Sequence, residues 1–476
     1  MNHYLTSDRF LDDRLERYPA TTYGGNERQR YADVEAVRVL TPPPTVAGVL
    51  REAWERYGRP IAVTEAHNGS TRDEQMRWMA DVWDTAKDLR QDGVHIDAVT
   101  SWSLLGSSGW NTLLTGSGAY EAGAYEVSGG AVRPTALVPL LKGLASGAQR
   151  HPVLAGEGWW RRPVRLAYPA TPHPEAATVE AARVAPLPPP PLLICGATGT
   201  LGQAIAGACV LRDIRHVLLS RAQLDLASSD SIAAALDEHA PWAVINAAGW
   251  VRVDDAESEA DACFAANASG AIALARECAA RGIPTVSFSS DLVFDGATDR
   301  AYVESDPVCP LNAYGRSKAA MEHGIDELPG SHLIVRTAAF FSPFDGHNFA
   351  VAVARTLSQG QVFVAADDQI VSPTYVPQLV SRTLDLIIDG VDGIWHLAND
   401  EAVSWAEFAR LVADACGLDA AKVQAVPSEA LNLPAPRPRF AALASQRGPS
   451  VGSLQAAIRL FGRFDMHTRA EIARAA

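Results

Sequence analysis

A loop with three glycines limits the folds open to this chain more than any other feature. It reads Gly196-Ala197-Thr198-Gly199-Thr200-Leu201-Gly202, follows the short apolar run 192–195 and opens the helical pattern of 203–211. Glycines at this spacing permit a tight turn, let a pyrophosphate approach the backbone, and allow close packing of helix on strand. The candidate dinucleotide contacts in this loop are Gly196, Thr198, Gly199, Leu201 and Gly202.

Downstream of the loop, short apolar runs alternate with helical stretches. The apolar runs are 192–195, 216–219, 242–246, 285–289 and 332–335, and the helical stretches include 229–238, 260–281 and 314–328. This alternation is typical of right-handed βαβ units. It predicts an α/β fold for 192–476: a Rossmann-type, doubly wound parallel sheet with a small substrate-binding part.

Composition divides the chain near its middle. Residues 1–162 hold seven of the eleven tryptophans and no cysteine, whereas 163–191 is rich in proline and ends in four consecutive prolines. Such a segment favours extended polyproline II, so we interpret it as a semi-rigid linker, with an ordered wrapping loop as the alternative. The predicted domains are 1–162, 163–191 and 192–476.

Charge and cysteine usage exclude several classes of protein. The formal net charge of −14 argues against a nucleic-acid or anionic-membrane partner, both of which need a basic face. No apolar run reaches the length of a transmembrane helix, and the first residues have no apolar stretch of signal-peptide type. Six scattered cysteines without a CxxC pair indicate reduced thiols, so a cytoplasmic location is expected. No His/Cys/Asp cluster has metal-ligand spacing, and no metal is expected.

Two further patterns suggest the chemistry of the second half. Tyr314 and Lys318 are four residues apart, so they share one face of a helix, where the ammonium would lower the pKa of the phenol. Ser290, at the end of the fourth strand, offers a hydroxyl to the same substrate oxygen. Ser220 and Arg221 end the second strand, where an NAD site usually has an acidic residue. Arg221 is either a 2′-phosphate contact, which favours NADPH slightly over NADH, or an exposed turn residue.

Taken in order, these motifs resemble the extended short-chain dehydrogenase/reductase superfamily and, within it, the dTDP-4-dehydrorhamnose reductases. The matching stretches are 246–249, 253–257, 289–296, 310–318, 348–350, 367–369 and 373–374. The resemblance implies reduction of the 4-keto group of a dTDP-6-deoxyhexulose with NADPH or NADH, as in dTDP-rhamnose biosynthesis. A nucleotide sugar is the implied partner, and a homodimer is compatible with this family.

The resemblance also implies roles for single residues. Tyr314 would be the acid, Lys318 would hold the nicotinamide ribose, and Ser290 takes the place of the family's catalytic threonine. Further cofactor contacts would come from Asp225, Leu226, Ala247 and Ala248. Substrate contacts would come from Ser289, Asp291, Asn348, Gln369 and Thr374.

Departures from the family pattern leave alternatives open. Leu292 stands where tyrosine is usual, Ala339 where an aromatic residue is common, Val371 where glycine is usual, and Arg439 where asparagine is usual. The alternatives are a non-catalytic nucleotide-binding regulatory module and a sugar-nucleotide epimerase or dehydratase. The dehydratases carry an Asp-Glu pair where this chain has Asp291-Leu292, which weakens that alternative.

Residues 1–160 resemble the last third of a glycoside hydrolase family 1 barrel. The segment 56–65 looks like the penultimate strand ending in the nucleophile, here Glu65, and the segments 101–105 and 2–4 resemble two other strands. The strand that would carry the acid/base glutamate is absent, and Ala66-His67 separate Glu65 from the family's Asn-Gly. We therefore expect a partial (β/α)8-barrel-like segment without glycosidase activity, and a start inside a strand suggests a fragment of a longer fusion.

Overall fold

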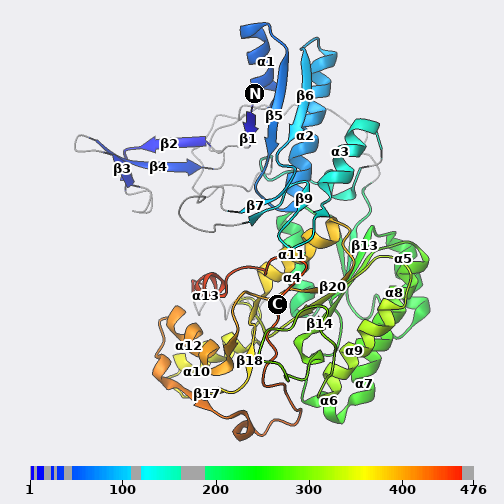
Figure 1. Ribbon diagram of the computed structural model, residues 1–476, viewed down its shortest axis with the longest axis vertical. Helices are drawn as coiled ribbons and strands as arrows, with labels where there is room; N and C mark the ends of the chain where they lie inside the picture. Colours follow the sequence, from blue (N-terminus) through cyan, green and yellow to red (C-terminus); the bar gives the residue numbers. More distant parts are fainter. Residues whose placement is uncertain are drawn as a thin grey trace. The chain divides into compact units, whose positions relative to one another are not determined.

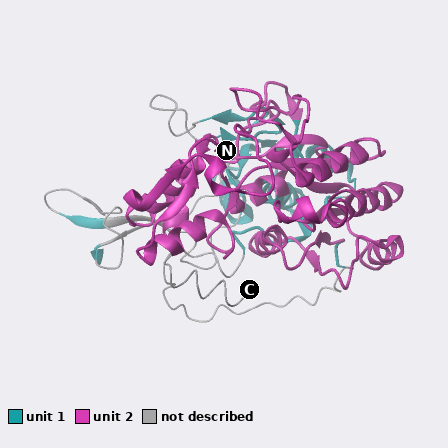
Figure 2. Cartoon of the chain, turned by 90° about the horizontal axis from the view of Figure 1, so that it is seen from below, with its two compact units in different colours: residues 1–125, 134–189 teal, residues 126–133, 190–476 magenta. Residues whose placement is uncertain are grey.

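The computed structural model describes residues 2–4, 8–15, 23–25, 29–36, 46–108, 120–148, 150–161 and 188–463. The chain divides into two compact units, the first formed by 1–125 and 134–189 and the second by 126–133 and 190–476 (Figure 2). Most of the expected linker, residues 163–187, lies outside the described residues. The short stretch 126–133 belongs to the second unit although first-unit sequence flanks it on both sides.

The first unit contains a three-stranded parallel sheet in the order β1-β5-β6. Its strands are β1 (Asn2–Tyr4), β5 (Ile61–His67) and β6 (Ile96–Ser101), and its helices are α1 (Val46–Tyr57), α2 (Arg72–Gln91) and α3 (Leu137–Ser146). The expected strand 56–65 begins only at Ile61, because Arg56 and Tyr57 complete helix α1. The expected strand 101–105 is wrong in its bounds, because β6 covers Ile96–Ser101 and overlaps it only at Ser101. The barrel-like architecture itself stays a prediction.

Smaller β elements accompany this sheet in the first half of the chain. A three-stranded antiparallel sheet has the order β2-β4-β3, and two-stranded pairs join β7 with β8 and β9 with β10. The strands are β2 (Asp8–Asp12), β3 (Tyr23–Gly25), β4 (Arg30–Ala36), β7 (Ser107–Ser108), β8 (Tyr120–Glu121), β9 (Tyr125–Glu126) and β10 (Arg133–Pro134).

The second unit is built on a six-stranded parallel sheet, as the alternation of strands and helices predicted (Figure 1). The strand order is β12-β11-β13-β14-β15-β20, and every neighbouring pair is parallel. The strands are β11 (Leu192–Cys195), β12 (His216–Leu219), β13 (Ala243–Asn246), β14 (Thr285–Ser290), β15 (His332–Thr337) and β20 (Gly393–His396). The order reverses between β11 and β13, and ligands of doubly wound sheets bind at such a reversal.

Helices cover both faces of this sheet. On one face α5 (Ser229–His239) packs on α8 (Gly270–Ala280), which packs on α9 (Ala313–Asp326). On the other face α4 (Thr200–Leu211) packs on α11 (Val376–Ile388). The expected single helix over 260–281 is instead split into α7 (Ala260–Phe264), a π-helical turn at Ala265–Ser269, and α8.

A smaller lobe follows the fifth strand. Its helices α10 (Phe349–Ser358), α12 (Trp405–Ala415) and α13 (Leu454–Gly462) enclose an apolar core with buried Phe341, Phe408 and Phe461. Helix α12 begins with a side-chain cap, because Ser404 Oγ accepts a 3.1 Å hydrogen bond from the amide of Glu407. Short strand pairs complete the lobe: β16 (Phe340–Phe341) with β19 (Thr374–Tyr375), β17 (Phe363–Ala366) with β22 (Val423–Val426), and β18 (Ile370–Val371) with β21 (Val403–Ser404). Among the helices in the described ranges, none is long and apolar enough to cross a membrane.

Candidate active site

The glycine loop leaves strand β11 at the point where the strand order reverses. Gly196 has a φ of +99°, and a Cβ there would lie 2.8 Å from the carbonyl carbon of Ala247, so the turn requires glycine. A Cβ on Gly202 would lie 2.1 Å from the carbonyl oxygen of Gly196, so this glycine lets α4 pack against the turn. Gly199 meets nothing closer than 3.6 Å, which leaves its outer side open to a ligand.

The N-terminus of α4 points its free amides out of this loop. Thr200 and Leu201 are the first residues of the helix, and Thr198 is exposed beside them. Backbone amides and the helix dipole favour an anion at this position. Thr200 Oγ1 donates a 2.9 Å hydrogen bond to Oδ2 of Asp345, so a carboxylate already lies close to the expected pyrophosphate position.

Ser220 and Arg221 follow β12, the neighbour of β11 in the sheet. Ser220 Oγ donates a 2.8 Å hydrogen bond to Oε1 of Gln223. The side chain of Arg221 is 85% exposed and its Nε lies 3.6 Å from Oδ1 of Asp225. The guanidinium is therefore free to turn toward a 2′-phosphate. Leu226 is partly buried and packs into the core of the unit.

The end of β13 lies on the other side of β11 from β12. Ala247 donates its amide to the carbonyl oxygen of Cys195, and Ala248 donates its amide to Oδ1 of Asn246 at 3.1 Å. Asn267, in the π-helical turn, accepts a 2.8 Å hydrogen bond from the amide of Trp250 and donates a 3.0 Å hydrogen bond to Ser317 Oγ. Asn267 therefore ties the segment that follows β13 to helix α9.

The three predicted catalytic side chains come together at the carboxyl end of β14. Asn312 caps α9 by accepting the amide of Gly315 at 2.7 Å, which sets the first turn of the helix that carries Tyr314 and Lys318. The first turn of α9 packs on the segment that follows Ser290, where a Cβ on Gly315 would lie 2.1 Å from the carbonyl oxygen of Leu292, and Ser290 opposes the rise in the pKa of Tyr314. Lys318 Nζ donates a 2.9 Å hydrogen bond to the carbonyl oxygen of Phe288 and lies 5.8 Å from the centroid of the Tyr314 ring.

The pKa of Tyr314 differs from what the sequence predicted. Burial first, and then the nearby Asp291 carboxylate, raise the pKa of Tyr314, so the expected lowering by Lys318 is wrong for this structure. Burial lowers the pKa of Lys318 to about 8. Burial also raises the pKa of Asp291 to about 7, against the opposing hydrogen bond from Ser290. Near neutral pH the tyrosine is therefore a protonated phenol.

A buried ion pair lies one helical turn beyond Lys318. Glu322 accepts hydrogen bonds from Arg336 at 2.9 and 2.7 Å, and both side chains are about 95% buried or more. Ser289 Oγ donates to the same carboxylate at 2.5 Å. The structure therefore engages the Ser289 hydroxyl in the core, whereas the sequence resemblance assigned it to the substrate.

The other predicted substrate residues are also buried. Asp291 accepts a 2.8 Å hydrogen bond from Ser290. Asn348 caps α10 through the amide of Val351 and donates to the carbonyl oxygens of Ser342 and Asp345. Gln369 is 7% exposed. Thr374 is fully buried and donates to the carbonyl oxygen of Ser372. Asn348 and Thr374 thus shape the lobe, and their contact with a substrate stays a prediction.

Sequence reasoning missed the positioning residues. Asn267, Glu322 and Arg336 hold the walls of the site, and all three are at least 95% buried. The available signal for Asn267 was an asparagine inside an alanine-rich helical stretch, where its side chain is unfavourable unless it bonds elsewhere. Arg437 was not among the predicted site residues, yet it forms a two-pronged pair with Asp254 at 2.8 and 2.9 Å.

Glu65 lies in the first unit, on strand β5, and is partly exposed. Two residues further on, His67 Nε2 lies 3.1 Å from Oε2 of Glu121, and its Nδ1 lies 3.2 Å from the carbonyl oxygen of Trp102. Across the described ranges of both units, no group of three or more His, Cys, Asp or Glu side chains is arranged to hold a metal ion.

Comparison with known proteins gives relatives for the second unit. A dTDP-4-dehydrorhamnose reductase of Streptomyces griseus is 34% identical over 275 residues, which is 56% of this chain and 90% of that protein. A dTDP-4-keto-6-deoxy-D-glucose reductase of Streptomyces niveus is 34% identical over 254 residues, 53% of this chain and 87% of that protein.

Solved structures agree with this similarity. The dTDP-4-dehydrorhamnose reductase of Bacillus anthracis, in complex with NADP, is 28% identical with a TM-score of 0.53, and the match covers 57% of this chain and 97% of that one. A UDP-glucose 4-epimerase of Thermus thermophilus in complex with NAD has a TM-score of 0.50 at 19% identity, covering 60% of this chain and 99% of that one; it shares the fold. The predicted Rossmann-type fold and the predicted reductase resemblance are both confirmed. The "RmlD substrate binding domain" family matches residues 191–457, more than half of the sequence, and the chain belongs to this family.

Proposed function

We propose that the second unit reduces the 4-keto group of a dTDP-6-deoxy-4-keto-hexose with NADPH or NADH, as in dTDP-rhamnose biosynthesis. One observation carries the proposal: the first turn of α9, with Tyr314, packs on the segment that follows Ser290 at the carboxyl end of β14, and Lys318 Nζ bonds to Phe288 of the same strand. The two Streptomyces relatives are named as reductases of such sugars, which supports the same reaction class here.

The residues around the glycine loop fit a dinucleotide. The side of Gly199 is open, and the amides at the start of α4 face the position of a pyrophosphate. A Cβ on Gly249 would lie 2.7 Å from Asn267 Oδ1 and 3.7 Å from Lys318 Nζ, so a side chain there would crowd the ribose region. Lys318 would hold the nicotinamide ribose, and Arg221 would contact a 2′-phosphate. When bound, NADPH or NADH supplies the hydride for C4 of the sugar.

The chain's own residues supply the proton and the orientation. Tyr314, protonated because its pKa is raised, donates its phenolic proton to the 4-keto oxygen, which becomes the hydroxyl of the product. The Ser290 hydroxyl, which donates to Asp291 in this structure, would turn its proton to the same oxygen and fix its position. The ammonium of Lys318 then stabilises the tyrosinate until solvent returns a proton. Ser290 and Lys318 are buried and Tyr314 is partly buried, which limits the access of water to the reacting carbonyl.

Two other functions remain as alternatives. A non-catalytic regulatory module would bind the dinucleotide without turnover, and the departures at Leu292, Ala339 and Val371 favour it. A dehydratase or epimerase would need a second acid or base, but Leu292 follows Asp291 where the dehydratases carry glutamate. The proton-donor geometry at Tyr314 favours the reductase over both.

The deciding experiment measures NADPH and NADH oxidation by the full chain with a panel of dTDP-4-keto-6-deoxy sugars. Turnover with product reduced at C4 supports the reductase. Dinucleotide binding without turnover on any sugar supports the regulatory module, and loss of water or inversion without net oxidation supports the dehydratase or epimerase. Light scattering on the same preparation tests the homodimer that the sequence analysis allows. We further propose a cytoplasmic location, since the six cysteines are all free thiols.

A further inference from the structure

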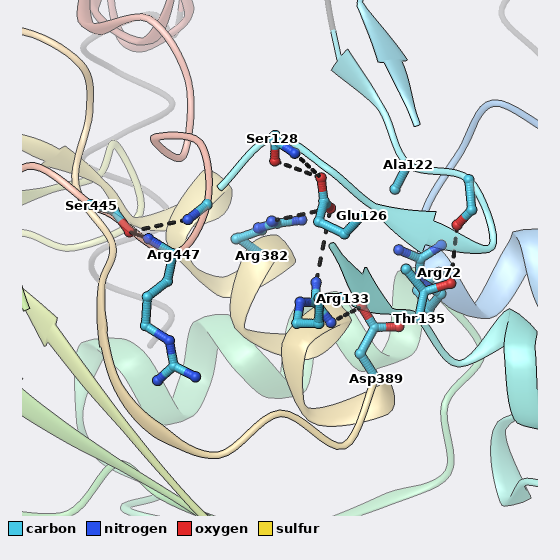
Figure 3. A network of polar contacts seen from close by, with 12 residues as sticks. Arg72, Ala122, Glu126, Ser128, Arg133, Thr135, Arg382, Asp389, Ser445 and Arg447 are labelled. Atoms are coloured by element: carbon cyan, nitrogen blue, oxygen red, sulfur yellow. Dashed lines mark hydrogen bonds and ion pairs between the residues drawn. The ribbon is translucent and has the colours of Figure 1, made fainter. Parts of the chain in front are cut away.

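The stretch Glu126–Arg133 is grouped with the second unit, although the residues on either side of it in sequence belong to the first. It joins β9 to β10 as a hairpin and lies beside Arg382 and Asp389 at the end of α11 and beside Ser445 and Arg447 (Figure 3). Its Arg133 also reaches Trp395 of β20.

Charged groups link the hairpin to α11 in an alternating series. The carboxylate of Glu126 is 1% exposed, and its Oε2 lies 3.6 Å from Nη2 of Arg382 and 3.8 Å from Nη2 of Arg133. Arg133 Nη1 in turn lies 3.2 Å from Oδ2 of the fully buried Asp389 side chain. Ser128 Oγ donates a 2.5 Å hydrogen bond to Oε1 of Glu126. The two acids and two arginines alternate, so every buried charge faces an opposite one.

Two guanidinium groups, one of them from the hairpin, lie over the ring of Trp395. Arg133 Cζ lies 5.5 Å and Arg447 Cζ lies 4.7 Å from the ring centroid of Trp395, which is 1% exposed. Arg447 is itself held by the carbonyl oxygens of Asp392 and Ile394 at 3.0 and 2.9 Å. Arg447 is thus held by backbone carbonyls of the second unit, and the hairpin contributes Arg133 as the other guanidinium.

Backbone packs directly on backbone at the tip of the hairpin. A Cβ on Gly129 would lie 2.1 Å from the carbonyl oxygen of Arg447 and 2.9 Å from the amide nitrogen of Gly448. A Cβ on Gly448 would in turn lie 2.9 Å from the Trp395 ring. Both glycines are therefore required for close approach, and the fit is specific in shape as well as in charge.

We propose that Arg382, Trp395 and Arg447 form a docking surface for a glycine-containing hairpin that carries one glutamate and one arginine, and that Glu126–Arg133 of the same chain is its occupant. The hairpin completes the surface of the second unit. Arg382 needs a carboxylate, which Glu126 supplies, and the Trp395 ring is covered by Arg133. The loop 445–448 admits only backbone at its closest point, and Gly129 meets this requirement.

The docking surface is remote from the reaction. Asp389 and Asp392 precede β20, so they lie near the start of a strand in a fully parallel sheet. Ser290 lies at the opposite, carboxyl end of β14. Release of the hairpin should therefore change the stability and dynamics of this edge without touching the residues proposed for catalysis.

The test uses full-length variants and readouts that do not need activity. Glu126→Lys places a cation against Arg382, and Gly129→Ala places a methyl group against the carbonyl of Arg447. Each should speed amide exchange across 127–132 by about tenfold or more, because a local opening then costs less free energy. The double variant Glu126→Lys/Arg382→Glu, which restores opposite charges, should regain part of the protection.

Two matched controls accompany these variants. Gly207→Ala changes an exposed glycine of α4 with nothing within 4 Å, and the pair Arg281→Asp/Asp237→Arg swaps an exposed ion pair of the same unit. Both should leave exchange at 127–132 unchanged. Unaltered protection in Glu126→Lys and in Gly129→Ala would overturn the proposal. Protection that depends on protein concentration, together with a dimer by light scattering, would also overturn it, because a second copy would then supply the hairpin.

Discussion

Nζ of Lys318 lies 5.8 Å from the centroid of the Tyr314 ring, one turn further along α9. The ammonium donates its hydrogen bond to the strand carbonyl of Phe288, while the phenol lies near Ser290 and Asp291. The two side chains therefore have different partners in this structure. The lysine is anchored on β14, and the tyrosine keeps its proton because burial and Asp291 raise its pKa.

Removal of the phenolic hydroxyl tests the proposed acid. Tyr314→Phe should lower kcat by about 10²–10⁴-fold, the usual contribution of a positioned general acid, and leave the Kd for NADPH nearly unchanged. Stopped-flow turnover and fluorescence titration of the cofactor measure the two effects. Tyr302→Phe, which removes a phenol bonded to Asp295 elsewhere in the unit, is the matched control. Turnover equal to that of the parent chain would remove Tyr314 from the mechanism.

The pH dependence of reduction should follow from the ionisation of Lys318. The pKa of Lys318 is lowered to about 8, so its positive charge is lost as pH rises through 8, and kcat/KM for reduction should fall there. Lys318→Arg keeps the charge and should move this limb to higher pH. A limb that stays near pH 8 in this variant would show that another group titrates.

Asp291 gives a separate effect on stability. Burial raises its pKa from 3.8 to about 7, so the folded state prefers the protonated acid. Its contribution to stability is therefore full below pH 4 and is lost as pH rises to about 7. At pH 8 Asp291→Asn should have a higher unfolding temperature than the parent chain, and its free energy of unfolding should be higher by at most about 4 kcal/mol. This gain in free energy should shrink toward pH 4. A gain that is independent of pH would contradict this assignment.

Arg221 tests the choice of cofactor. Its side chain is 85% exposed, and its Nε lies 3.6 Å from Oδ1 of Asp225. A 2′-phosphate can therefore compete with this carboxylate for the guanidinium. Arg221→Ala should weaken NADPH binding by about tenfold or more and leave NADH binding unchanged, because only NADPH carries that phosphate. Calorimetric titration of both cofactors measures the ratio, with Arg300→Ala, another exposed arginine, as control. An unchanged ratio would make Arg221 a surface residue.

Asp345 should act on both cofactors alike. Its carboxylate accepts a hydrogen bond from Thr200 at the start of α4, where the pyrophosphate common to NADPH and NADH is expected. Asp345→Asn removes this negative charge and should strengthen both cofactors equally, by about two- to fivefold. The measurement is the same titration. Strengthening of NADPH alone, or weakening of both, would place the carboxylate outside the pyrophosphate position.

Glu65 should not support glycoside hydrolysis. A retaining glycosidase needs two carboxyl groups roughly 5–5.5 Å apart, one as nucleophile and one as acid. Glu65 could take only the first role, because the strand that carries the acid in the resembling family has no counterpart in this sequence. Aryl β-glycosides, whose good leaving groups reduce the need for an acid, are the sensitive substrates. Turnover that disappears in Glu65→Gln would contradict the prediction.

Local sequence was sufficient for much of the second unit. Glycines at 196, 199 and 202, short apolar runs and the Tyr314–Lys318 spacing follow from steric and periodic rules that act over a few residues, so the βαβ series and the shared helix face of Tyr314 and Lys318 could be predicted. The order of the sheet, the sixth strand β20 and the π-helical turn at Ala265–Ser269 were not predicted. They depend on which segments pack together across the unit.

Only tertiary packing decided the titration of the site and the place of the hairpin. Spacing alone suggested that Lys318 would lower the pKa of Tyr314, but burial outweighs a neighbouring charge once the phenol leaves water. Likewise, nothing in the sequence of Glu126–Arg133 indicates that its partners stand some 250 residues further on, at Arg382 and Asp389. Sequence patterns report neighbours along the chain, whereas desolvation and buried ion pairs arise only when distant segments exclude water from one another.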